Sequence, residues 1–354
     1  MRRSSVITIL CVSFLFASLL SLYAEQHPFS VHDMLAMDRI SDPQVAPDGQ
    51  TIVFTLMTTD LKANRGRTDL WMVHTNSKEL LRLTTDPASD FNPRWSPCGK
   101  YIWFLSTRSG SSQVWRMKTD AGEAIQVTDL PLDIGNLVVS KDGKWLAFTM
   151  DVFPEFTNPK ETKTKLDEIA ARKRTGRIYE DLFIRHWDTW EDGRRSHLFV
   201  MSSQGGEAQD LMPGMDADTP SQPFGGPEEI TFTPDSKGLI FTARDVGNQE
   251  AWSTDFDLYW VPVQGRQKSR CITQENKAWD TSPVFSPSGQ KLAYLAMERP
   301  GYESDRFRII VQDWPDGEKH TVAQNWDRSP SFICWSPDGT KIYAGAPNLG
   351  QHSL

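Results

Sequence analysis

Residues Ser336-Pro337-Asp338-Gly339 form a short unit that recurs along the chain of 354 residues. Two close copies, 96–99 and 286–289, keep Ser, Pro and Gly, and three looser copies stand at 46–49, 140–143 and 233–236. Aligned on the Gly position, which Ser236 occupies in the fourth copy, the units are 50, 44, 93, 53 and 50 residues apart. Four intervals fall near the blade length of propeller repeats, about 40 to 50 residues, and the fifth is close to one repeat plus an insertion of about 45 residues.

The composition of the unit predicts a β-hairpin. Pro sets the backbone angle of the second turn position, Asp or Ser bonds back to the backbone, and Gly takes the left-handed conformation that closes a type I turn with a bulge. Apolar residues recur four positions before the Gly position and three and five positions after it, so each hairpin is expected to bury one stripe. These positions hold Val45, Trp95, Val139, Phe232, Phe285 and Trp335, then Ile52, Ile102, Leu146, Leu239, Leu292 and Ile342, then Phe54, Phe104, Phe148, Phe241, Tyr294 and Ala344.

A second pair of strands follows each turn, which gives four strands per unit. Four-stranded sheets that repeat in series, and that cannot each bury both faces alone, predict an all-β fold, a β-propeller; the alternative is a β-sandwich with similar hairpins. The units cover about 43–85, 93–128, 137–212, 230–273 and 283–323, and a sixth begins at 332 with only its first hairpin. The propeller domain is therefore expected at 43–354, with an incomplete last blade. Because an open sheet edge is unfavourable in a soluble protein, we expect the chain to be truncated.

The first 24 residues are typical of a secretory signal peptide. Arg2 and Arg3 precede an apolar run from Val6 to Leu22, and Ala24 offers a small residue for cleavage. A membrane anchor is the alternative, although a run carrying four hydroxyl residues is marginal for crossing about 30 Å of hydrocarbon. We expect a periplasmic or secreted protein, with no membrane association after cleavage and a lead-in segment at 25–42.

Charge and cysteine content exclude several classes of function. The formal net charge is −8 with no clustered basic stripe, which argues against nucleic acid as a partner. Beyond the signal, Cys98, Cys271 and Cys334 are an odd number without metal-site spacing. One disulfide or free thiols both remain open.

An insertion at about 151–196 interrupts the third unit between its two hairpins. Residues Lys163 to Arg174 predict a charged helix, because Leu166, Ile169 and Ala170 fall on one face. Arg172-Lys173-Arg174 is either an anion-binding patch or, the favoured interpretation, a solvated helix face.

A dense cluster of aromatic and charged residues follows this helix, at 179–192. We expect it to form a substrate-binding loop, in which carboxylates hold a cationic group and Trp rings wall a pocket. The alternative is an internal polar network in which Arg185 pairs with Asp188 and the Trp side chains pack as blade core. The predicted substrate-binding residues are Arg185, His186, Trp187, Asp188, Glu191 and Asp192.

Signals of catalysis are missing from the sequence. No G-x-S-x-G nucleophile elbow occurs, the seven His residues lack metal-site spacing, and no phosphate-binding Gly loop is present. We therefore predict no catalytic residue, no metal and no cofactor in this chain.

The entry segment and the cluster in the insertion resemble one known family. They are similar to the propeller part of secreted serine peptidases of the prolyl oligopeptidase family, in its acylaminoacyl-peptidase and dipeptidyl-peptidase branch. The likeness covers nearly all of the chain after the signal. It is carried by Phe29-Ser30-Val31-His32-Asp33-Met34-Leu35, Arg39-Ile40-Ser41-Asp42-Pro43 and Arg185-His186-Trp187-Asp188-Thr189-Trp190.

The resemblance implies a module that gates substrate for a serine peptidase. In that family the propeller covers a C-terminal α/β-hydrolase domain with the catalytic Ser, Asp and His, a domain that these residues do not contain, so the chain alone is expected to be inactive. The channel admits short peptides, and acidic propeller side chains grip the free amino terminus. The candidates are Asp188, Glu191 and Asp192, with Glu180 and Asp181 behind them.

A binding propeller without enzymatic activity, like that of the periplasmic Tol system, is the competing function. It would need a small α/β domain ahead of the blades, yet only 18 residues separate Ala24 from Pro43.

Overall fold

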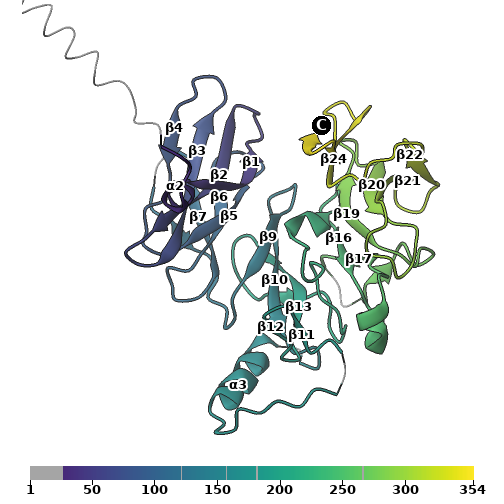
Figure 1. The fold of residues 1–354 in the computed structure, drawn as a ribbon, viewed down its shortest axis with the longest axis horizontal. Coiled ribbons are helices and arrows are strands. Elements are labelled where there is room, and N and C mark those ends of the chain that lie inside the picture. The colour runs from purple at the N-terminus through teal and green to yellow at the C-terminus, as the bar shows by residue number, and fades with distance from the viewer. Residues whose placement is uncertain (1–26, 121, 157, 181, 265–266) are drawn as a thin grey trace, which may run out of the picture. The chain divides into compact units, whose positions relative to one another are not determined.

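The computed structural model describes residues 27–354 except 121, 157, 181, 265 and 266 (Figure 1). The predicted signal peptide, 1–24, lies outside the described residues. Within that part of the chain, no helix has the length and apolar content that crossing a membrane requires.

The described residues fall into two compact units. The smaller unit contains the residues up to Arg39 together with Met57–Arg67, and the larger contains Ile40–Leu56 and Thr68–Leu354. In the smaller unit, helix α2 (Val31–Ala36) begins at a capping box, in which Ser30 and Asp33 bond to each other's backbone. In the same unit, Arg67 pairs with Asp60 at 2.8 Å.

Six antiparallel sheets, most of whose strands are labelled in Figure 1, confirm the all-β propeller: the first five have four strands and the sixth has three. The first three sheets consist of β1 (Arg39–Val45), β2 (Thr51–Asp60), β3 (Arg65–His74) and β4 (Leu80–Arg82); β5 (Asp90–Trp95), β6 (Tyr101–Ser106), β7 (Gln113–Lys118) and β8 (Ile125–Gln126); and β9 (Gly135–Val139), β10 (Trp145–Val152), β13 (Arg195–Ser202) and β14 (Gln209–Asp210). The other three consist of β15 (Ile230–Phe232), β16 (Gly238–Ala243), β17 (Asp257–Pro262) and β18 (Arg270–Cys271); β19 (Asp280–Phe285), β20 (Lys291–Ala296), β21 (Arg308–Asp313) and β22 (Lys319–Val322); and β23 (Phe332–Trp335), β24 (Ile342–Asn348) and β25 (Gln351–Ser353). We call these sheets blades 1 to 6.

The sixth blade carries one strand more than predicted. Strand β25 pairs with the end of β24 through Ala346, Pro347 and Asn348, so a third strand joins the predicted hairpin. The turn between them has positive φ at Leu349 and Gly350, which suits a tight hairpin.

All six predicted turns form, and all six have the same geometry. The five glycines at the fourth position have φ of 69–74°, and Ser236 has φ of 57°. In each turn the amide of the fourth residue donates to the carbonyl of the first at 2.8–2.9 Å. Each turn connects the first and second strands of its blade, as expected.

Successive turns also touch one another. A Cβ atom at Gly143 would lie 3.2 Å from Cδ of Pro97, and one at Gly339 would lie 3.5 Å from Cδ of Pro287. A Cβ atom at Gly99 would lie 3.9 Å from Cδ of Pro47, and one at Gly289 would lie 2.6 Å from Cβ of Pro234. The amide of Asp142 donates to Oγ of Ser236 at 3.3 Å. The six corners are therefore neighbours in order rather than scattered over unrelated sheets.

In blades 2 to 5, which each have a neighbour on both sides, the second strand is buried on both faces. The predicted stripe is confirmed, because Ile102 and Phe104 in β6 are fully buried, but Trp103 and Leu105 on the opposite face are buried as well. Each sheet packs between two neighbours, which is why the strand has no solvated side. Trp95 fixes one such contact by donating from its indole nitrogen to the carbonyl of Gln44 in blade 1, and Trp335 does the same to Val284 in blade 5.

A threonine hydroxyl fastens the fourth strand to the third in three blades. In blade 4, Oγ1 of Thr273 accepts from the amide of Leu258 at 2.9 Å and donates to Oδ1 of Asp257 at 2.8 Å. Blade 1 uses Thr84 with Leu70 and Asp69, and blade 2 uses Thr128 with Val114 and Gln113. Because these groups are buried, each hydroxyl provides a hydrogen-bond partner to groups that would otherwise be unpaired.

Cys98, Cys271 and Cys334 are free thiols, so of the two open alternatives the structure supports the second.

Candidate functional site

The insertion leaves blade 3 between β10 and β13. In Figure 1 the labels α3, β11 and β12 lie at one end of that strand pair. Helix α3 spans Pro159–Ala170, so it begins four residues before the predicted start and ends before Arg172. The cause is local: Asn158 caps the helix by accepting from the amide of Lys160 at 2.9 Å, and Pro suits the first helical position.

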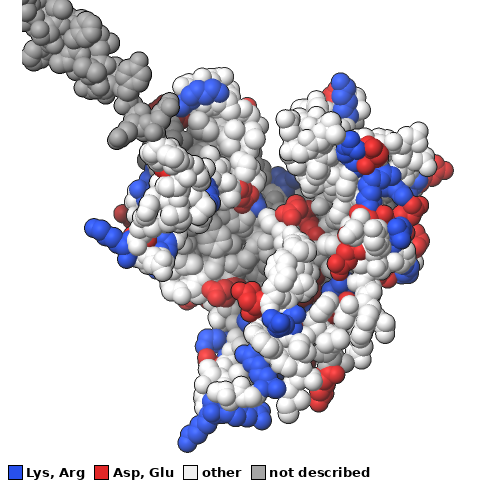
Figure 2. Space-filling model, in the orientation of Figure 1, with Lys and Arg blue, Asp and Glu red and all other residues white. Residues whose placement is uncertain are grey.

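The three basic residues 172–174 are therefore not helical; they follow the helix and are exposed. Lys and Arg side chains gather over this part of the insertion, at the bottom of Figure 2. On the helix itself, Lys163 pairs with Asp167 one turn later, which is a solvated arrangement.

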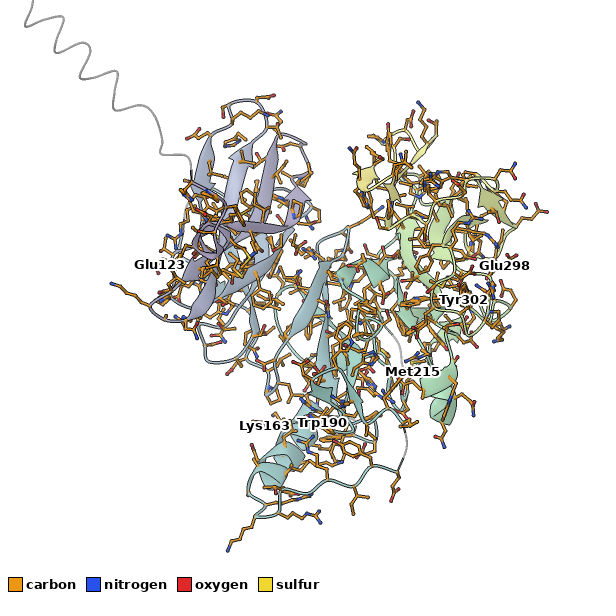
Figure 3. All side chains as sticks on the ribbon, viewed as in Figure 1. Glu123, Lys163, Trp190, Met215, Glu298 and Tyr302 are labelled. Atoms are coloured by element: carbon orange, nitrogen blue, oxygen red, sulfur yellow. The ribbon has the colours of Figure 1, made fainter. Side chains whose placement is uncertain are left out.

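A small hairpin holds most of the predicted substrate-binding residues. Strands β11 (Arg185–His186) and β12 (Thr189–Trp190) pair across a turn that contains Trp187 and Asp188. Trp187 and Trp190 are 66% and 52% exposed, so neither is blade core. Figure 3 labels Trp190 on this hairpin.

Arg185 interacts within the hairpin, but not with Asp188. Its guanidinium donates to the carbonyl of Trp187 at 2.6 Å and lies 5.7 Å from the centre of the Trp190 ring. Asp188 is exposed, and so is Glu180. Asp181 lies outside the described residues.

The two remaining predicted carboxylates differ in environment. Asp192 pairs with Arg194 at 2.8 Å; burial raises the pKa of Asp192, but the hydrogen bonds from Arg194 outweigh it and hold the pKa below its usual value. Glu191 is half-buried, and its pKa is raised by burial, then by the nearby carboxylates Asp218 and Glu250 against the opposing charge of Arg195. Glu191 thus belongs to a larger charged group.

Arg195 is the centre of that group. It pairs with Asp216 at 2.7 Å, with Asp218 at 3.1 Å and with Glu250 at 2.7 Å. Glu250 also accepts from Arg244 at 3.3 Å. Burial raises the pKa of Asp218, although Arg195 opposes the shift. We name Glu191, Arg195, Asp216, Asp218, Arg244 and Glu250 the Arg195 cluster.

The Arg195 cluster continues into the hairpin through aromatic rings. Arg244 lies 5.9 Å from the ring centre of Phe183, and Phe183 lies 5.2 Å from His186. The ring of His186 contacts Trp187 at 5.9 Å, and Trp187 contacts Phe224 at 5.5 Å. Of the six predicted residues, His186, Trp187 and Glu191 therefore meet at this site, while Arg185, Asp188 and Asp192 point to local partners or solvent.

Sequence reasoning missed most of the cluster. Arg195 begins β13, Asp216 and Asp218 lie in the loop after β14, Arg244 follows β16, and Glu250 lies in a 3₁₀ helix, η3 (Gly247–Trp252). No short spacing links residues from two blades, so no motif could have gathered them.

The cluster contains four carboxylates and two guanidinium groups. This excess of negative charge, half-buried and bordered by aromatic rings, suits a cationic group of a ligand better than an anion. Among the described residues, no three His, Cys, Asp or Glu side chains are arranged to hold a metal ion.

Comparison with known proteins agrees with the fold. Residues 35–164 match the model of the TolB beta propeller domain. The chain is 32% identical over 314 residues to dipeptidyl-peptidase 5 of Porphyromonas gingivalis, covering 87% of this chain and 45% of that protein. It spans about half the length of the curated relatives it matches.

Two solved structures share the architecture. The Pyrococcus horikoshii acylaminoacyl peptidase superposes with a TM-score of 0.63 at 15% identity, over 88% of this chain and 43% of that one. A putative TolB from Agrobacterium tumefaciens has a TM-score of 0.51 at 16% identity, over 88% and 91%. At such identities the two structures establish the fold alone.

The resemblance carried by the entry segment and by residues 185–190 is thus confirmed from whole-chain similarity. The chain is a homologue of dipeptidyl-peptidase 5 that corresponds to the propeller part of that longer protein.

Proposed function

We propose that this chain is the substrate-gating propeller portion of a secreted or periplasmic serine exopeptidase that cleaves short peptides. Its partner is a C-terminal α/β-hydrolase domain that carries the catalytic Ser, Asp and His. The observation behind this proposal is the 32% identity to dipeptidyl-peptidase 5 across 87% of the chain. The propeller supplies recognition, and the chain alone is inactive.

The Arg195 cluster is the proposed contact for the free amino terminus of the peptide. Its two guanidinium groups balance only two of its four carboxylates. Burial raises the pKa of Glu191 and of Asp218, and the charge of Arg195 only partly opposes it. An ammonium group supplies that charge, because an opposite charge within about 4–6 Å favours the ionised carboxylate.

The exposed rings of Trp187 and Trp190 are the proposed contacts for the peptide side chains. Each offers a flat apolar face beside a polar group: Trp190 beside Arg185, and Trp187 beside His186. Asp188 adds negative charge at the rim, where its effect is screened by solvent, whereas the charge of Asp192 is balanced by Arg194. In this arrangement the six predicted residues have unequal roles.

The charge of the cluster favours dipeptidyl release over acylaminoacyl release. An acylated amino terminus is neutral, so it cannot compensate the unbalanced carboxylates and would leave them desolvated. A free ammonium group carries a positive charge, so it compensates these carboxylates.

Binding to the isolated chain tests this assignment. Calorimetric titration with Ala-Ala amide and with its N-acetyl form should show binding of the free amine only. The Glu250→Gln variant should weaken binding of the free amine about tenfold or more, because it removes one charge. The matched control is Glu207→Gln, which changes an exposed carboxylate in the same blade region. Equal binding of both peptides would refute the role of the cluster.

Inactivity of the chain alone is a separate test. Aminoacyl and dipeptidyl chromogenic esters should not be hydrolysed, and fluorophosphonate probes should label no Ser. Labelling above the level of heat-denatured protein would show a nucleophile within this chain and contradict the gating assignment.

A non-enzymatic binding propeller is the second candidate, favoured by the match of residues 35–164 to the TolB beta propeller domain. A pull-down with envelope proteins separates the two. Specific capture of envelope proteins, combined with no affinity for dipeptide amides, would favour the binding propeller.

A further inference from the structure

Blades 2 and 5 align residue for residue over their first two strands. Residues 90–108 correspond to 280–298 without a gap, from the first residue of β5 or β19 to two residues past β6 or β20. Both strand pairs have the same interruption of register, and Asn92 and Ser282 share a positive φ of 54° and 55°. The two blades can therefore be compared position by position.

In blade 2 a buried carboxylate is paired with an arginine. Asp90 is fully buried, and both its oxygens accept from Nη2 of Arg108 at 2.6 and 2.7 Å. Ser106 accepts from Nε of the same guanidinium at 2.8 Å. The rings of Trp115 and Phe104 flank the guanidinium at 4.9 and 5.5 Å. The cation is thus held by charge, hydrogen bonds and aromatic faces.

In blade 5 the carboxylate is retained and the cation is missing. Asp280 replaces Asp90 and is 1% exposed, but Glu298 stands where blade 2 has Arg108. Oδ1 of Asp280 accepts from Asn276 at 2.9 Å, while Oδ2 has no hydrogen-bond partner. Burial raises the pKa of Asp280 to about 8. A buried carboxyl oxygen without a partner is costly and calls for an explanation.

A pocket of about 250 Å³ occupies the corresponding place. It is lined by Asp280 and by the counterparts of the groups that surround Arg108: Tyr294 for Phe104, Ala296 for Ser106, Ile310 for Trp115 and Glu298 for Arg108 itself. The exchange of Ser for Ala and of Trp for Ile makes the side chains smaller, so space is left where blade 2 has its own cation. Glu298 is labelled in Figure 3.

The charged groups around the pocket do not replace that cation. Arg308 pairs with Glu298, and Lys319 pairs with Glu275 and donates to the carbonyl of Ile272. Neither forms an ion pair with Asp280 among the described residues. His320 and Thr321 complete the polar lining, and Asp257 of blade 4 adds a second negative charge that raises the pKa of Asp280.

We propose that this pocket binds an alkylguanidinium cation, which takes the place that the Arg108 side chain occupies in blade 2. The cation pairs with Asp280 and rests on the ring of Tyr294. A free small guanidine and the arginine side chain of a peptide offer the same group. This binding site is distinct from the Arg195 cluster and does not rest on the proposed peptidase function.

Calorimetric titration of the full chain with methylguanidine tests the proposal. Methylurea has nearly the same shape without charge and is the matched control ligand. Methylguanidine should bind at least tenfold more tightly than methylurea, and at pH 7 its binding should release close to one proton, because Asp280 ionises. Repeating the titration in buffers of different ionisation enthalpy measures that proton. Equal affinity for both ligands, or no proton release, would overturn the proposal.

Two variants tie the binding to the pocket. Asp280→Asn removes the charge, and Ala296→Ser combined with Glu298→Arg rebuilds the blade 2 arrangement inside the pocket. Both should abolish methylguanidine binding, whereas Glu123→Gln, an exposed residue far along the chain, should not change it. If the double variant melts cooperatively and still binds methylguanidine with unchanged affinity, the pocket is not the site.

The reverse substitution in blade 2 is an independent check. Arg108→Ala leaves Asp90 without its partner and opens the same space, so it should lower the melting temperature. Millimolar methylguanidine should recover part of that loss, while methylurea should not. The absence of any difference between the ligands would show that this geometry does not select guanidinium.

A titration of the unmodified chain with Gly-Arg-Gly distinguishes the two sources of the guanidinium group. Tighter binding than that of methylguanidine indicates a peptide side chain, and weaker binding indicates a free guanidine; either result supports the site.

Discussion

Cβ of Pro234 lies 2.6 Å from the point where a side chain on Gly289 would begin. The two residues belong to successive turns, so this contact joins blades 4 and 5 at their corners. It combines with a φ of 74° at Gly289, which residues with a side chain rarely adopt. Gly289→Ala should therefore lower the free energy of unfolding by about 2–4 kcal/mol, from backbone strain and from the forced displacement of Pro234.

Gly49→Ala is the matched control for this prediction. Gly49 has nearly the same φ, 71°, but a Cβ atom there would meet nothing within 4 Å. It should cost only the strain, about 1 kcal/mol. Urea denaturation of both variants measures the difference, and equal losses would mean that contact between neighbouring turns does not contribute.

The hydroxyl that fastens the outer strand of blade 4 gives a second prediction. Thr273→Val keeps the shape of the side chain but leaves the amide of Leu258 and the carboxylate of Asp257 without this partner. The unfolding free energy should fall by about 1–3 kcal/mol, because both groups are buried. Thr75→Val, at an exposed hydroxyl that donates to a backbone carbonyl, should change it by less than about 0.5 kcal/mol. A loss no greater than that of the control would contradict the prediction.

The fold could be predicted from the turns because each turn is a local event. Pro, Asp and Gly within four residues determine the backbone, and the apolar positions around them determine which strand pairs form. The Arg195 cluster could not be predicted, because Arg195 and Glu250 meet only after two blades have packed. The helix start was missed for a smaller reason: Asn158 and Pro159 cap α3, and the prediction weighed the apolar face alone.

The carboxyl group of Asp280 should make stability depend on pH. Its pKa is about 8 in the folded chain and about 3.9 in an unfolded one. Between these values the folded state keeps a proton that the unfolded state has released, so the free energy of unfolding falls as pH rises, by at most about 1.4 kcal/mol per pH unit. Asp280→Asn cannot ionise, so its unfolding free energy should fall less than that of the wild type between about pH 5 and 8.

Urea denaturation across this pH range, with Asp90→Asn as the comparison, measures the effect. Asp90→Asn weakens the pairing of Arg108 and should be destabilised at every pH in the range. A constant difference between the wild type and Asp280→Asn from about pH 5 to 8 would show that Asp280 of the folded chain is already ionised over this range.

Glu250 should matter more to stability than an ordinary surface carboxylate, because two arginines share it. Its side chain is mostly buried, and it accepts from Arg195 at 2.7 Å and from Arg244 at 3.3 Å. Glu250→Gln leaves Arg195 with Asp216 and Asp218, but it deprives Arg244 of its carboxylate partner, so the unfolding free energy should fall by about 2–4 kcal/mol.

The control variant Asp316→Asn breaks a solvent-exposed pair with Arg270 at 3.0 Å, so it should lower the unfolding free energy by less than about 1 kcal/mol. Raising the salt concentration should reduce the cost of Asp316→Asn while leaving that of Glu250→Gln nearly unchanged, because buried pairs are screened less. Equal costs for the two variants at low salt would mean that Arg244 is satisfied by its remaining contacts, the carbonyl of Ser253 and the rings of Phe256 and Phe183.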